Sequence, residues 1–399
     1  MWGSLAFNLK AIIRMRRSAK FPQEMRSLLV NRSPMTENLA VTALPTPLAT
    51  QLVSAAHAPR LTEYRGALTP CEFDAPAAEI AALAGEAAAH DLGWMRRVSV
   101  RGEDRFRWLS GMVTNAVNDL PENGGAWNLV LNAQGRIQGD LTVWREGDAL
   151  DLLIVADQFE KLMAHFDHFI IMDDVELVAQ DPTAETTIGL TGLQARDVLV
   201  RMGLPVPAEP MTGQRVEWNG LNLRIYHGYG TLADHYEIGT PLAGLTLLWR
   251  ALSTAGATPV GSTALEAFRV AEGIPVYGID IAERDLPQET SQTRALHFSK
   301  GCYLGQEIVE RIRSRGNVHR HLRQLELDGP LARTGTDLLL DGAPIGSISS
   351  ATELPLGGTI RRFALGMVRS EAEVKNRPLT YLAGSAAGTA RILDKPPAL

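Results

Sequence analysis

The sequence predicts an α+β fold in which helices and strands follow in mixed order and a small antiparallel barrel closes the C-terminal end. Three observations lead to this class. The chain has 399 residues, more than one hydrophobic core normally organises. Helical and strand patterns succeed one another without the regular alternation of a βαβ barrel. After Gly316, short apolar runs alternate with turns that contain Gly, Pro or Asp, which is typical of an antiparallel barrel.

Changes in composition divide the chain into four predicted regions. Residues 1–70 form a basic leader and a lead-in that we expect to be poorly ordered. Residues 71–185 form a first α+β domain, residues 186–316 a second one, and residues 317–399 the barrel. The arginine-rich, acid-poor start is typical of a targeting peptide. Methionines at positions 15, 25 and 35 leave open a later translation start, which we prefer.

The first α+β domain begins with an alanine-rich segment that predicts a helix over residues 76–90. A second helix is predicted after Gly102, because acidic residues open its first turn and apolar residues follow on one face. In the remaining segments, the spacing of apolar residues predicts strands over residues 95–100, 127–131, 141–144, 152–155 and 175–179, and a helix over residues 158–166.

The second α+β domain repeats this mixture. Gly273 followed by Pro275 predicts that a helix within the stretch Leu265–Gly278 ends at Gly273, because glycine adopts the left-handed C-terminal conformation and proline prevents continuation. Another helix begins at Gly305 or Gln306. The other predicted elements are strands at 187–190, near 216 and at 223–226, and helices at 194–202 and 242–255. The barrel strands are predicted at 322–327, 338–340, 345–349, 363–368, 379–381 and 388–392.

Charge and cysteine content restrict the function classes. A net charge of −6 gives no electrostatic attraction to nucleic acid, so we expect none as a partner. No run reaches the roughly 18–20 apolar residues that span a bilayer, so we expect a soluble protein without a membrane partner. The cysteines Cys71 and Cys302 lie far apart and complete no metal motif, which favours the reducing cytoplasm and no metal site. We expect a monomer.

The segment Lys300–Glu307 contains a cation, a thiol, an aromatic ring, an amide and a carboxylate between two glycines. Cys302 precedes a predicted helix N-terminus and lies near Lys300, and both features favour a reactive thiolate. The alternative is a small buried cysteine that only packs. Likewise, Glu307 and Arg311 would form a plain surface ion pair on the helix.

Two other stretches contain chemically suggestive residues. Asn132 and Asp140 lie on or beside a glycine-containing hairpin turn, where side chains can face a ligand, although any hairpin turn prefers such residues. Arg269 and Glu272 lie near the end of a predicted helix, where they suit carboxylate and amidine groups of a ligand or simply form a charged helix face.

The order Lys-Gly-Cys-Tyr-x-Gly-Gln-Glu resembles the signature of the YgfZ-type folate-binding proteins, relatives of the glycine-cleavage T-protein, an aminomethyltransferase. The stretch from Arg269 to Pro275 and the turn Leu286–Glu289 resemble further segments of this family, and the likeness extends from about Ala75 to the C-terminus. It implies a T-protein-like fold around a central cavity for tetrahydrofolate or a derivative. Two departures stand out: Ala271 replaces a glutamate of the family, and Gly139-Asp140 replaces a pair of aspartates.

The resemblance implies a set of site residues. The predicted catalytic group comprises Cys302, Lys300 and Asp140. The predicted folate-binding group comprises Asn132, Asp140, Arg269, Glu272, Tyr277, Gln288, Tyr303, Gln306 and Glu307.

Three functions follow as hypotheses. The first is a tetrahydrofolate-binding accessory protein that uses Cys302 to support iron–sulfur cluster assembly or repair in other enzymes, including those of tRNA modification. Its partners are iron–sulfur enzymes or cluster-assembly proteins, because a lone thiolate cannot hold a cluster. The second is a folate-dependent aminomethyltransferase or demethylase, which needs a carboxylate near the folate amine. The third is a binding module in which Cys302 merely packs.

Overall fold

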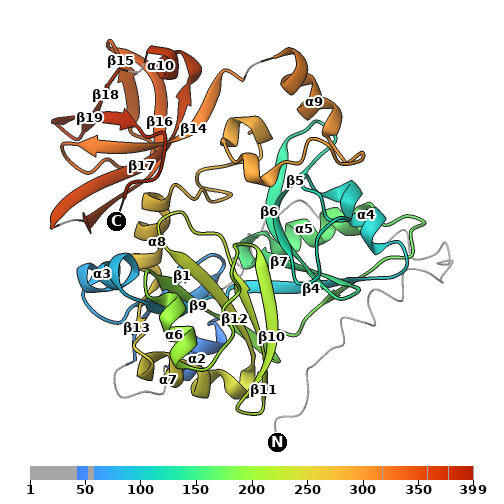
Figure 1. The fold of residues 1–399 in the computed structure, drawn as a ribbon. Helices are drawn as coiled ribbons and strands as arrows, with labels where there is room; N and C mark the ends of the chain where they lie inside the picture. Colours follow the sequence, from blue (N-terminus) through green and yellow to red (C-terminus); the bar gives the residue numbers. More distant parts are fainter. Residues whose placement is uncertain (1–42, 53–57, 317, 357, 376, 399) are drawn as a thin grey trace, which may run out of the picture. The chain divides into compact units, whose positions relative to one another are not determined.

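A computed structural model describes residues 43–52, 58–316, 318–356, 358–375 and 377–398 (Figure 1). Within these residues the strands form a two-stranded hairpin, a five-stranded sheet, a six-stranded sheet and a closed six-stranded barrel. The five-stranded sheet is called the first sheet below, and the six-stranded sheet the second sheet. The basic leader of residues 1–42 lies outside the described residues.

The first sheet is antiparallel, with the strand order β5-β6-β7-β4-β8. Its helices, α4 and α5, pack through Leu109, Leu162 and Phe166 onto strand residues such as Val98 and Leu141, which form one buried cluster. The bounds are β4 Met95–Arg101, α4 Arg105–Met112, β5 Gly125–Leu131, β6 Ile137–Glu146, β7 Ala149–Val155, α5 Ala156–His168 and β8 Glu176–Ala179.

The second sheet has the order β10-β11-β12-β9-β3-β13, and β13 pairs with β3 in parallel. The helices α6 and α7 cover it with Val198, Leu199 and Leu248, which are fully buried in one cluster with strand residues. The bounds are β3 Ala88–Asp91, β9 Glu185–Gly192, α6 Ala195–Arg201, β10 Thr212–Trp218, β11 Leu221–His227, β12 Asp234–Pro241, α7 Leu245–Thr254 and β13 Thr258–Pro259.

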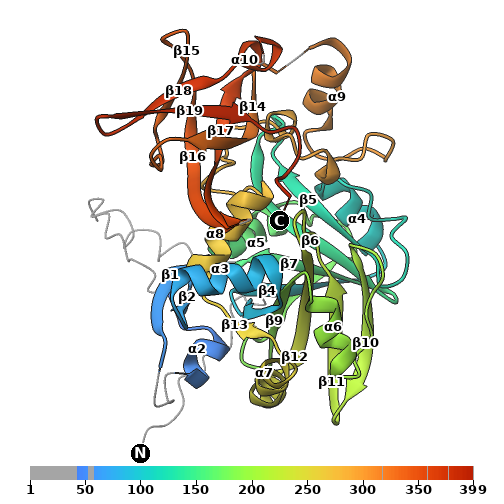
Figure 2. The same cartoon turned by 60° about the vertical axis from the view of Figure 1, so that its left-hand side comes forward.

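Two helices, α3 (Pro76–Gly85) and α8 (Ser262–Glu272), lie side by side in both views (Figures 1 and 2). They share a buried cluster with β5, with α9 (Gln306–Arg315) and with barrel strands, so this core connects the first sheet to the barrel. Gly273 ends α8 at φ 73°, and Gly305 precedes α9 at φ 81°. Both predicted helix boundaries are confirmed: the left-handed Gly273 ends α8, as glycine does without steric cost, and α9 begins directly after Gly305.

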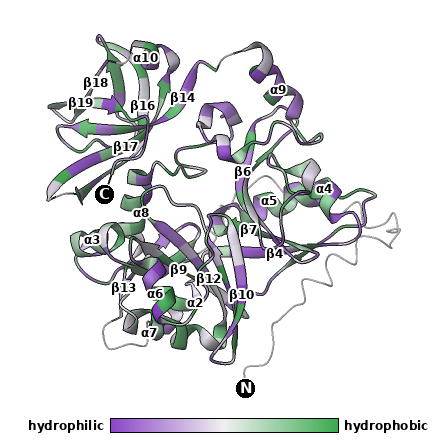
Figure 3. Ribbon diagram, viewed as in Figure 1, coloured by the Kyte–Doolittle hydropathy of each residue, from purple (hydrophilic) through white to green (hydrophobic). Residues whose placement is uncertain are grey.

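The barrel closes in the order β14-β17-β16-β15-β18-β19. Near the end of β14, buried Leu325 and Leu327 alternate with the more exposed Glu326 and Asp328, whereas residues 363–366 of β17 are buried in succession. Ala364 belongs to the buried cluster of the barrel, and Phe363 packs in the core that α3 and α8 share. Hydrophilic and hydrophobic positions are accordingly mixed along the barrel strands (Figure 3). The bounds are β14 Arg320–Asp328, β15 Asp337–Leu340, β16 Ala343–Leu356, β17 Thr359–Arg369, α10 Ser370–Lys375, β18 Leu379–Ala383 and β19 Ala386–Ile392.

The predicted α+β class with a C-terminal antiparallel barrel is confirmed. The helix predicted over residues 76–90 is wrong after Gly85, because Ala88–Asp91 form strand β3 and pair with β9. The alanines there pack as small residues in a fully buried strand, and this tertiary contact overrides their helix propensity. The proposed domain limits near residues 185 and 316 stay a prediction.

We expected residues 1–70 to be poorly ordered, and this expectation is wrong for residues 43–52 and 58–70, which the structure describes. Pro47–Leu52 form helix α2, and β1 (Arg60–Tyr64) and β2 (Ala67–Glu72) form a hairpin across Arg65 and Gly66. Gly66 at φ 80° lies so close to the start of α5 that a Cβ would come within 2.6 Å of the Asp157 backbone nitrogen. None of the described helices is both long enough and apolar enough to span a bilayer.

Candidate functional site

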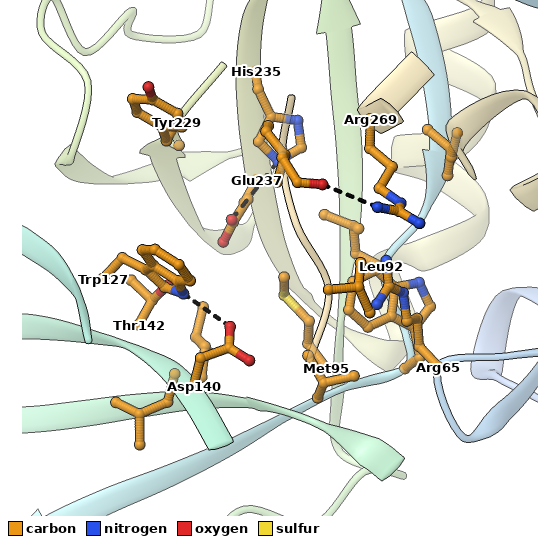
Figure 4. Close-up of a pocket in the computed structure, with 18 of the residues that line it drawn as sticks. Arg65, Leu92, Met95, Trp127, Asp140, Thr142, Tyr229, His235, Glu237 and Arg269 are labelled. Atoms are coloured by element: carbon orange, nitrogen blue, oxygen red, sulfur yellow. Dashed lines mark hydrogen bonds and ion pairs between the residues drawn. The ribbon is translucent and has the colours of Figure 1, made fainter. Parts of the chain in front are cut away.

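A cavity of about 260 Å³ lies between the first and second sheets. Strands β5, β6 and β7 supply one wall, β3, β9 and β12 the opposite wall, and residues of α8 and the segment after it the end (Figure 4). Aromatic and aliphatic side chains dominate its lining, and a few polar groups point inward. This composition is typical of a pocket for an organic ligand that is held by a few directional contacts.

Asp140 on β6 is the carboxylate of the first-sheet wall. Its Oδ2 accepts a hydrogen bond from Trp127 Nε1 at 2.8 Å, and its Oδ1 accepts one from Gln158 Nε2 at 3.0 Å. The Asp140 amide in turn donates to Gln158 Oε1 at 2.9 Å. These contacts fix the orientation of the carboxylate on a rigid strand, as a ligand-binding or proton-handling group requires.

Glu237 and His235 on β12 face the cavity from the opposite wall (Figure 4). Glu237 is buried, and its Oε2 has no hydrogen-bond partner within the described part of the chain. His235 Nε2 lies 3.7 Å from Glu237 Oε1. A buried carboxylate oxygen without a partner is costly, so this atom is a strong acceptor for a donor that a ligand supplies.

A chain of hydrogen bonds behind Glu237 determines which ring nitrogen of His235 carries the proton. Thr191 Oγ1 lies 2.9 Å from His90 Nε2 and 2.7 Å from His235 Nδ1. Burial lowers the pKa of His90 well below its ordinary value, with the nearby His235 adding to the effect, so His90 is neutral.

We assign the His90 proton to Nε2, because its Nδ1 is buried without a described partner and an unpaired acceptor costs less than an unpaired donor. His90 then donates to Thr191, Thr191 donates to His235 Nδ1, and the Nε2–H of His235 faces Glu237.

Arg294 lies at the end of the cavity and stacks on two aromatic rings. Its guanidinium carbon is 3.5 Å from the centre of the Tyr229 ring and 4.4 Å from the centre of the Trp127 ring. Its Nε donates to Gln292 Oε1 at 3.2 Å. Burial lowers the pKa of Arg294 to about 10, so the group stays positively charged at neutral pH. The stacking holds the plane of the guanidinium in one orientation.

Arg269 lines the cavity, but its donors bind the protein itself. The guanidinium pairs with Glu266 and Asp280, and it also donates to Ser350 Oγ at 2.9 Å and to the Ile274 carbonyl at 3.1 Å. Burial alone lowers the pKa of Arg269, but its carboxylate partners outweigh burial and raise it above the ordinary value. The side chain therefore joins α8 to the barrel.

Glu272 and Tyr277 complete the end of the cavity. Glu272 Oε1 accepts hydrogen bonds from the amides of Thr231 at 3.0 Å and Leu232 at 3.2 Å, and burial raises its pKa. The Tyr277 hydroxyl accepts a hydrogen bond from Lys161 Nζ at 2.7 Å. Glu272 thus secures the loop before β12, while Tyr277 presents an aromatic face to the cavity.

The segment Lys300–Glu307 lies outside the lining of this cavity. Lys300 Nζ donates to the carbonyls of Ser110, Val113 and Asn115 at 2.7–2.8 Å, which satisfies the C-terminal end of α4. Burial lowers the pKa of Lys300 to about 8, so the ammonium keeps its three donors at neutral pH.

Side chains around Lys300 are exposed, buried in the central core or bound to the backbone. Cys302 and Glu307 are exposed, Tyr303 is buried in the central core, and Gln306 Oε1 accepts from the Tyr303 amide at 3.3 Å. Gln288 Nε2 donates to the Val309 carbonyl at 2.8 Å. The thiol is therefore open to solvent on a loop that its neighbours hold in place.

The two glycine-containing motifs pack against each other. A Cβ on Gly305 would lie 2.6 Å from the Asn132 carbonyl oxygen, and a Cβ on Gly135 would lie 2.8 Å from Ile308 Cβ. Asn132 Oδ1 accepts from the amides of Gln134 and Arg136 at 3.0 Å and closes its own turn. Close approach of the two backbones explains the glycines at these positions.

The structure brings four of the predicted site residues to the cavity: Asp140, Arg269, Glu272 and Tyr277. Seven others, Asn132, Gln288, Lys300, Cys302, Tyr303, Gln306 and Glu307, are outside its lining. The sequence interpretation missed His235, Glu237 and Arg294. The alternation of polar and apolar residues from His235 to Ile238 was an available signal, since it matches a strand with one polar face.

Comparisons with known proteins agree with this fold. The family model described as the GCVT N-terminal domain matches residues 27–300. An aminomethyltransferase of Rubrobacter xylanophilus is 28% identical over 336 residues, which are 80% of this chain and 88% of the relative. An aminomethyltransferase of Staphylococcus haemolyticus is 25% identical over 327 residues, 80% of this chain and 89% of that protein.

Among solved structures, the glycine cleavage system aminomethyltransferase T of Bartonella henselae matches with a TM-score of 0.76. Its sequence identity is 20%, and the match covers 86% of this chain and 95% of that one, so the two share a fold. Because the family model matches well over half of the sequence, the chain belongs to the GCVT N-terminal domain family, the superfamily of the T-protein.

Proposed function

We propose that the chain binds a reduced folate, tetrahydrofolate or a derivative, in the cavity between the two sheets. The observation that carries this proposal is the buried Oε2 of Glu237, which has no partner among the described residues and lines a mainly apolar cavity. A pterin carries an amino group and a ring N–H on one edge, and such a pair donates two parallel hydrogen bonds to a carboxylate. The aromatic lining suits its flat ring.

The relatives support the same ligand class. Two of them are named aminomethyltransferases, and the resemblance to the T-protein implies tetrahydrofolate or a derivative as the ligand. Asp140 faces Glu237 across the cavity, so a folate held at Glu237 by its pterin edge would pass the Asp140 carboxylate. The site is accordingly shared between Glu237, which selects the ring, and Asp140, which lies beside the part of the ligand that carries a one-carbon group.

For the role of the protein we propose a YgfZ-type accessory function in iron–sulfur cluster assembly or repair. The exposed thiol of Cys302 supports this role, because a partner can reach it without entering the folate cavity. A single thiolate ligates a cluster only together with other ligands, so the partner is an iron–sulfur enzyme or an assembly protein. We further propose that the chain acts as a monomer in the cytoplasm.

The names of the relatives and the placement of Asp140 also favour a second candidate, a folate-dependent aminomethyltransferase or demethylase. Its chemistry needs a group that accepts or donates a proton near the folate amine. Asp140 is a carboxylate with a fixed orientation in the cavity. Transfer of the one-carbon group of an aminomethylated carrier protein to tetrahydrofolate, with release of ammonia, separates the two candidates, because the accessory role predicts none.

Calorimetric titration with tetrahydrofolate and its 5-formyl derivative tests the folate proposal. We expect binding by the native chain and weaker binding after Glu237→Gln, which keeps the shape of the side chain but removes its charge. No binding to the native chain at millimolar ligand contradicts the proposal. In cells, Cys302→Ala is expected to lower the activity of iron–sulfur enzymes while the protein stays folded, and an unchanged activity contradicts the accessory role.

A further inference from the structure

His235 and Glu237 are two residues apart on β12 and present different polar atoms to the cavity (Figure 4). His235 Nε2 lies 3.7 Å from Glu237 Oε1, which is too far for a hydrogen bond but close enough for one flat ligand to meet both groups. Glu237 Oε2 is buried and has no partner in the described part of the chain. The wall therefore offers an acceptor, and beside it a ring nitrogen that donates or accepts according to where the histidine carries its proton.

The hydroxyl of Thr191 decides this question, because it connects the two histidines. Its Oγ1 lies 2.9 Å from His90 Nε2 and 2.7 Å from His235 Nδ1. With the proton of His90 on Nε2, the hydroxyl accepts from His90 and donates its own hydrogen to His235 Nδ1. Nδ1 of His235 is then an acceptor, so Nε2 carries the proton and is a donor that faces the cavity.

The packing around His90 holds this chain of hydrogen bonds in place. His90 and Thr191 are buried, and the rings of His90 and His235 are stacked with 12° between their planes and 5.7 Å between their centres. A Cβ on Gly189, two residues before Thr191 on β9, would overlap the His90 ring, so glycine leaves the room that the ring needs. Burial strengthens each hydrogen bond and makes an unpaired group costly, which favours a single arrangement of the protons.

We propose that His235 donates a hydrogen bond from Nε2 to the 4-oxo group of the pterin, beside the ring N–H and the amino group that donate to Glu237. Thr191 and His90 are positioning residues, because they keep the proton of His235 on the nitrogen that faces the cavity. This inference rests on the folate proposal and narrows its ligand class to reduced pterins with a 4-oxo group. A pteridine with a 4-amino group would bring a donor against the His235 donor, so the wall discriminates against it.

Calorimetry on the full chain compares tetrahydrofolate with its 4-amino analogue. We expect the native chain to prefer tetrahydrofolate by about 100-fold or more. His235→Phe keeps a flat ring but removes the donor, and it is expected to lower this preference about tenfold. Because the analogue also lacks the ring N–H that donates to Glu237, the part of the preference that remains in His235→Phe belongs to Glu237.

Two changes at Thr191 test the positioning role. Thr191→Val keeps the shape of the side chain but removes the hydroxyl, so His235 can turn or shift its proton, and the preference is expected to fall about threefold. Thr191→Ser restores the hydroxyl and is expected to restore the preference. Nitrogen-15 NMR of the native chain without ligand, at about pH 8, should show His235 protonated on Nε2 alone, whereas exposed His297 should exchange between its tautomers.

A proton on Nδ1 of His235 in the native chain overturns the inference without any variant. Equal affinity of the native chain for the two ligands, or a preference that His235→Phe leaves unchanged, also overturns it and leaves the folate proposal standing. If Thr191→Val changes neither the protonated nitrogen of His235 nor the preference, the positioning role of Thr191 and His90 is overturned. If neither ligand binds, the folate proposal fails, and the inference fails with it.

Discussion

The wall of the cavity and the segment Lys300–Glu307 differ in how their polar groups are used. In the segment, Lys300 donates to three carbonyls and Gln306 accepts from a backbone amide, so the polar atoms hold the chain in place. In the wall, Glu237 keeps a buried oxygen without a described partner, and the terminal nitrogens of Arg294 have no hydrogen-bond acceptor among the described residues. The segment in which reactive residue types are close together in the sequence therefore contains a lysine that stabilises the backbone and one exposed thiol. The polar residues of the cavity are instead far apart in the sequence.

The largest expected effect separates the two glutamates, Glu237 and Glu307. Glu237→Gln removes the charged acceptor from the cavity wall and is expected to weaken tetrahydrofolate binding by about 10- to 100-fold, since a hydrogen bond to a charged group is worth roughly 1.5–3 kcal/mol. Glu307→Gln is the control, because Glu307 is exposed and outside the cavity lining. Calorimetry measures both, and a larger loss for Glu307→Gln would reverse the contrast between the two regions.

Lys300→Met tests whether this part of the segment is structural. The change removes the donor for the carbonyls of Ser110, Val113 and Asn115, so the free energy of unfolding is expected to fall by about 2–3 kcal/mol. Lys395→Met, at an exposed position, should leave it within about 0.5 kcal/mol. Urea denaturation measures the loss. An unchanged stability together with weaker folate binding would instead indicate a direct role of Lys300 in the site.

Asp91 tests the electrostatics of the second-sheet wall, because it follows His90 directly on β3. Burial raises the pKa of Asp91 to about 6, although Thr46 and the Gly93 amide donate to its carboxylate. The folded protein therefore binds a proton more readily than the unfolded chain between about pH 4 and 6. The contribution to stability is fully present below about pH 4 and is lost as the pH rises through 6.

Asp91→Asn is expected to remove the pH dependence of stability that Asp91 causes. The stability of the native chain relative to the variant is expected to be greater at pH 4.5 than at pH 7 by about 1–2 kcal/mol, as measured by urea denaturation. Asp148→Asn is the control, because its side chain is 97% exposed. A difference that does not change with pH, or that grows toward pH 7, would mean that Asp91 is ionised in the folded protein across this range.

Prediction from sequence succeeded where local rules decide the structure. Gly273 ends a helix and could be recognised because glycine has a special role at helix C-termini, and the helix after Gly305 could be recognised from the spacing of the apolar residues Ile308, Val309 and Ile312. It failed at Ala88–Asp91, where pairing with β9 outweighs helix propensity. The cavity residues on β12 and Arg294 could not be connected from the sequence, since sheet pairing and aromatic stacking bring them together across long stretches of chain.

The smallest expected effect concerns Cys302. The thiol is exposed and outside the cavity lining, so Cys302→Ser should change the free energy of unfolding by less than about 0.5 kcal/mol and leave tetrahydrofolate affinity within about twofold. The rate of alkylation of Cys302 by iodoacetamide should be the same with and without bound folate. Cys71 serves as an internal control, because it is 2% exposed and should react far more slowly.

These expectations place the two proposed activities in separate parts of the molecule. If folate slows the alkylation of Cys302 by tenfold or more, the ligand either covers the thiol or moves its loop, and the contrast between cavity and segment fails. An unchanged rate, combined with loss of iron–sulfur enzyme activity in cells that carry Cys302→Ser, would mean that the thiol serves a partner on the outer surface. The thiol would then react with its partner outside the folate cavity, because Cys302 is not part of the cavity lining.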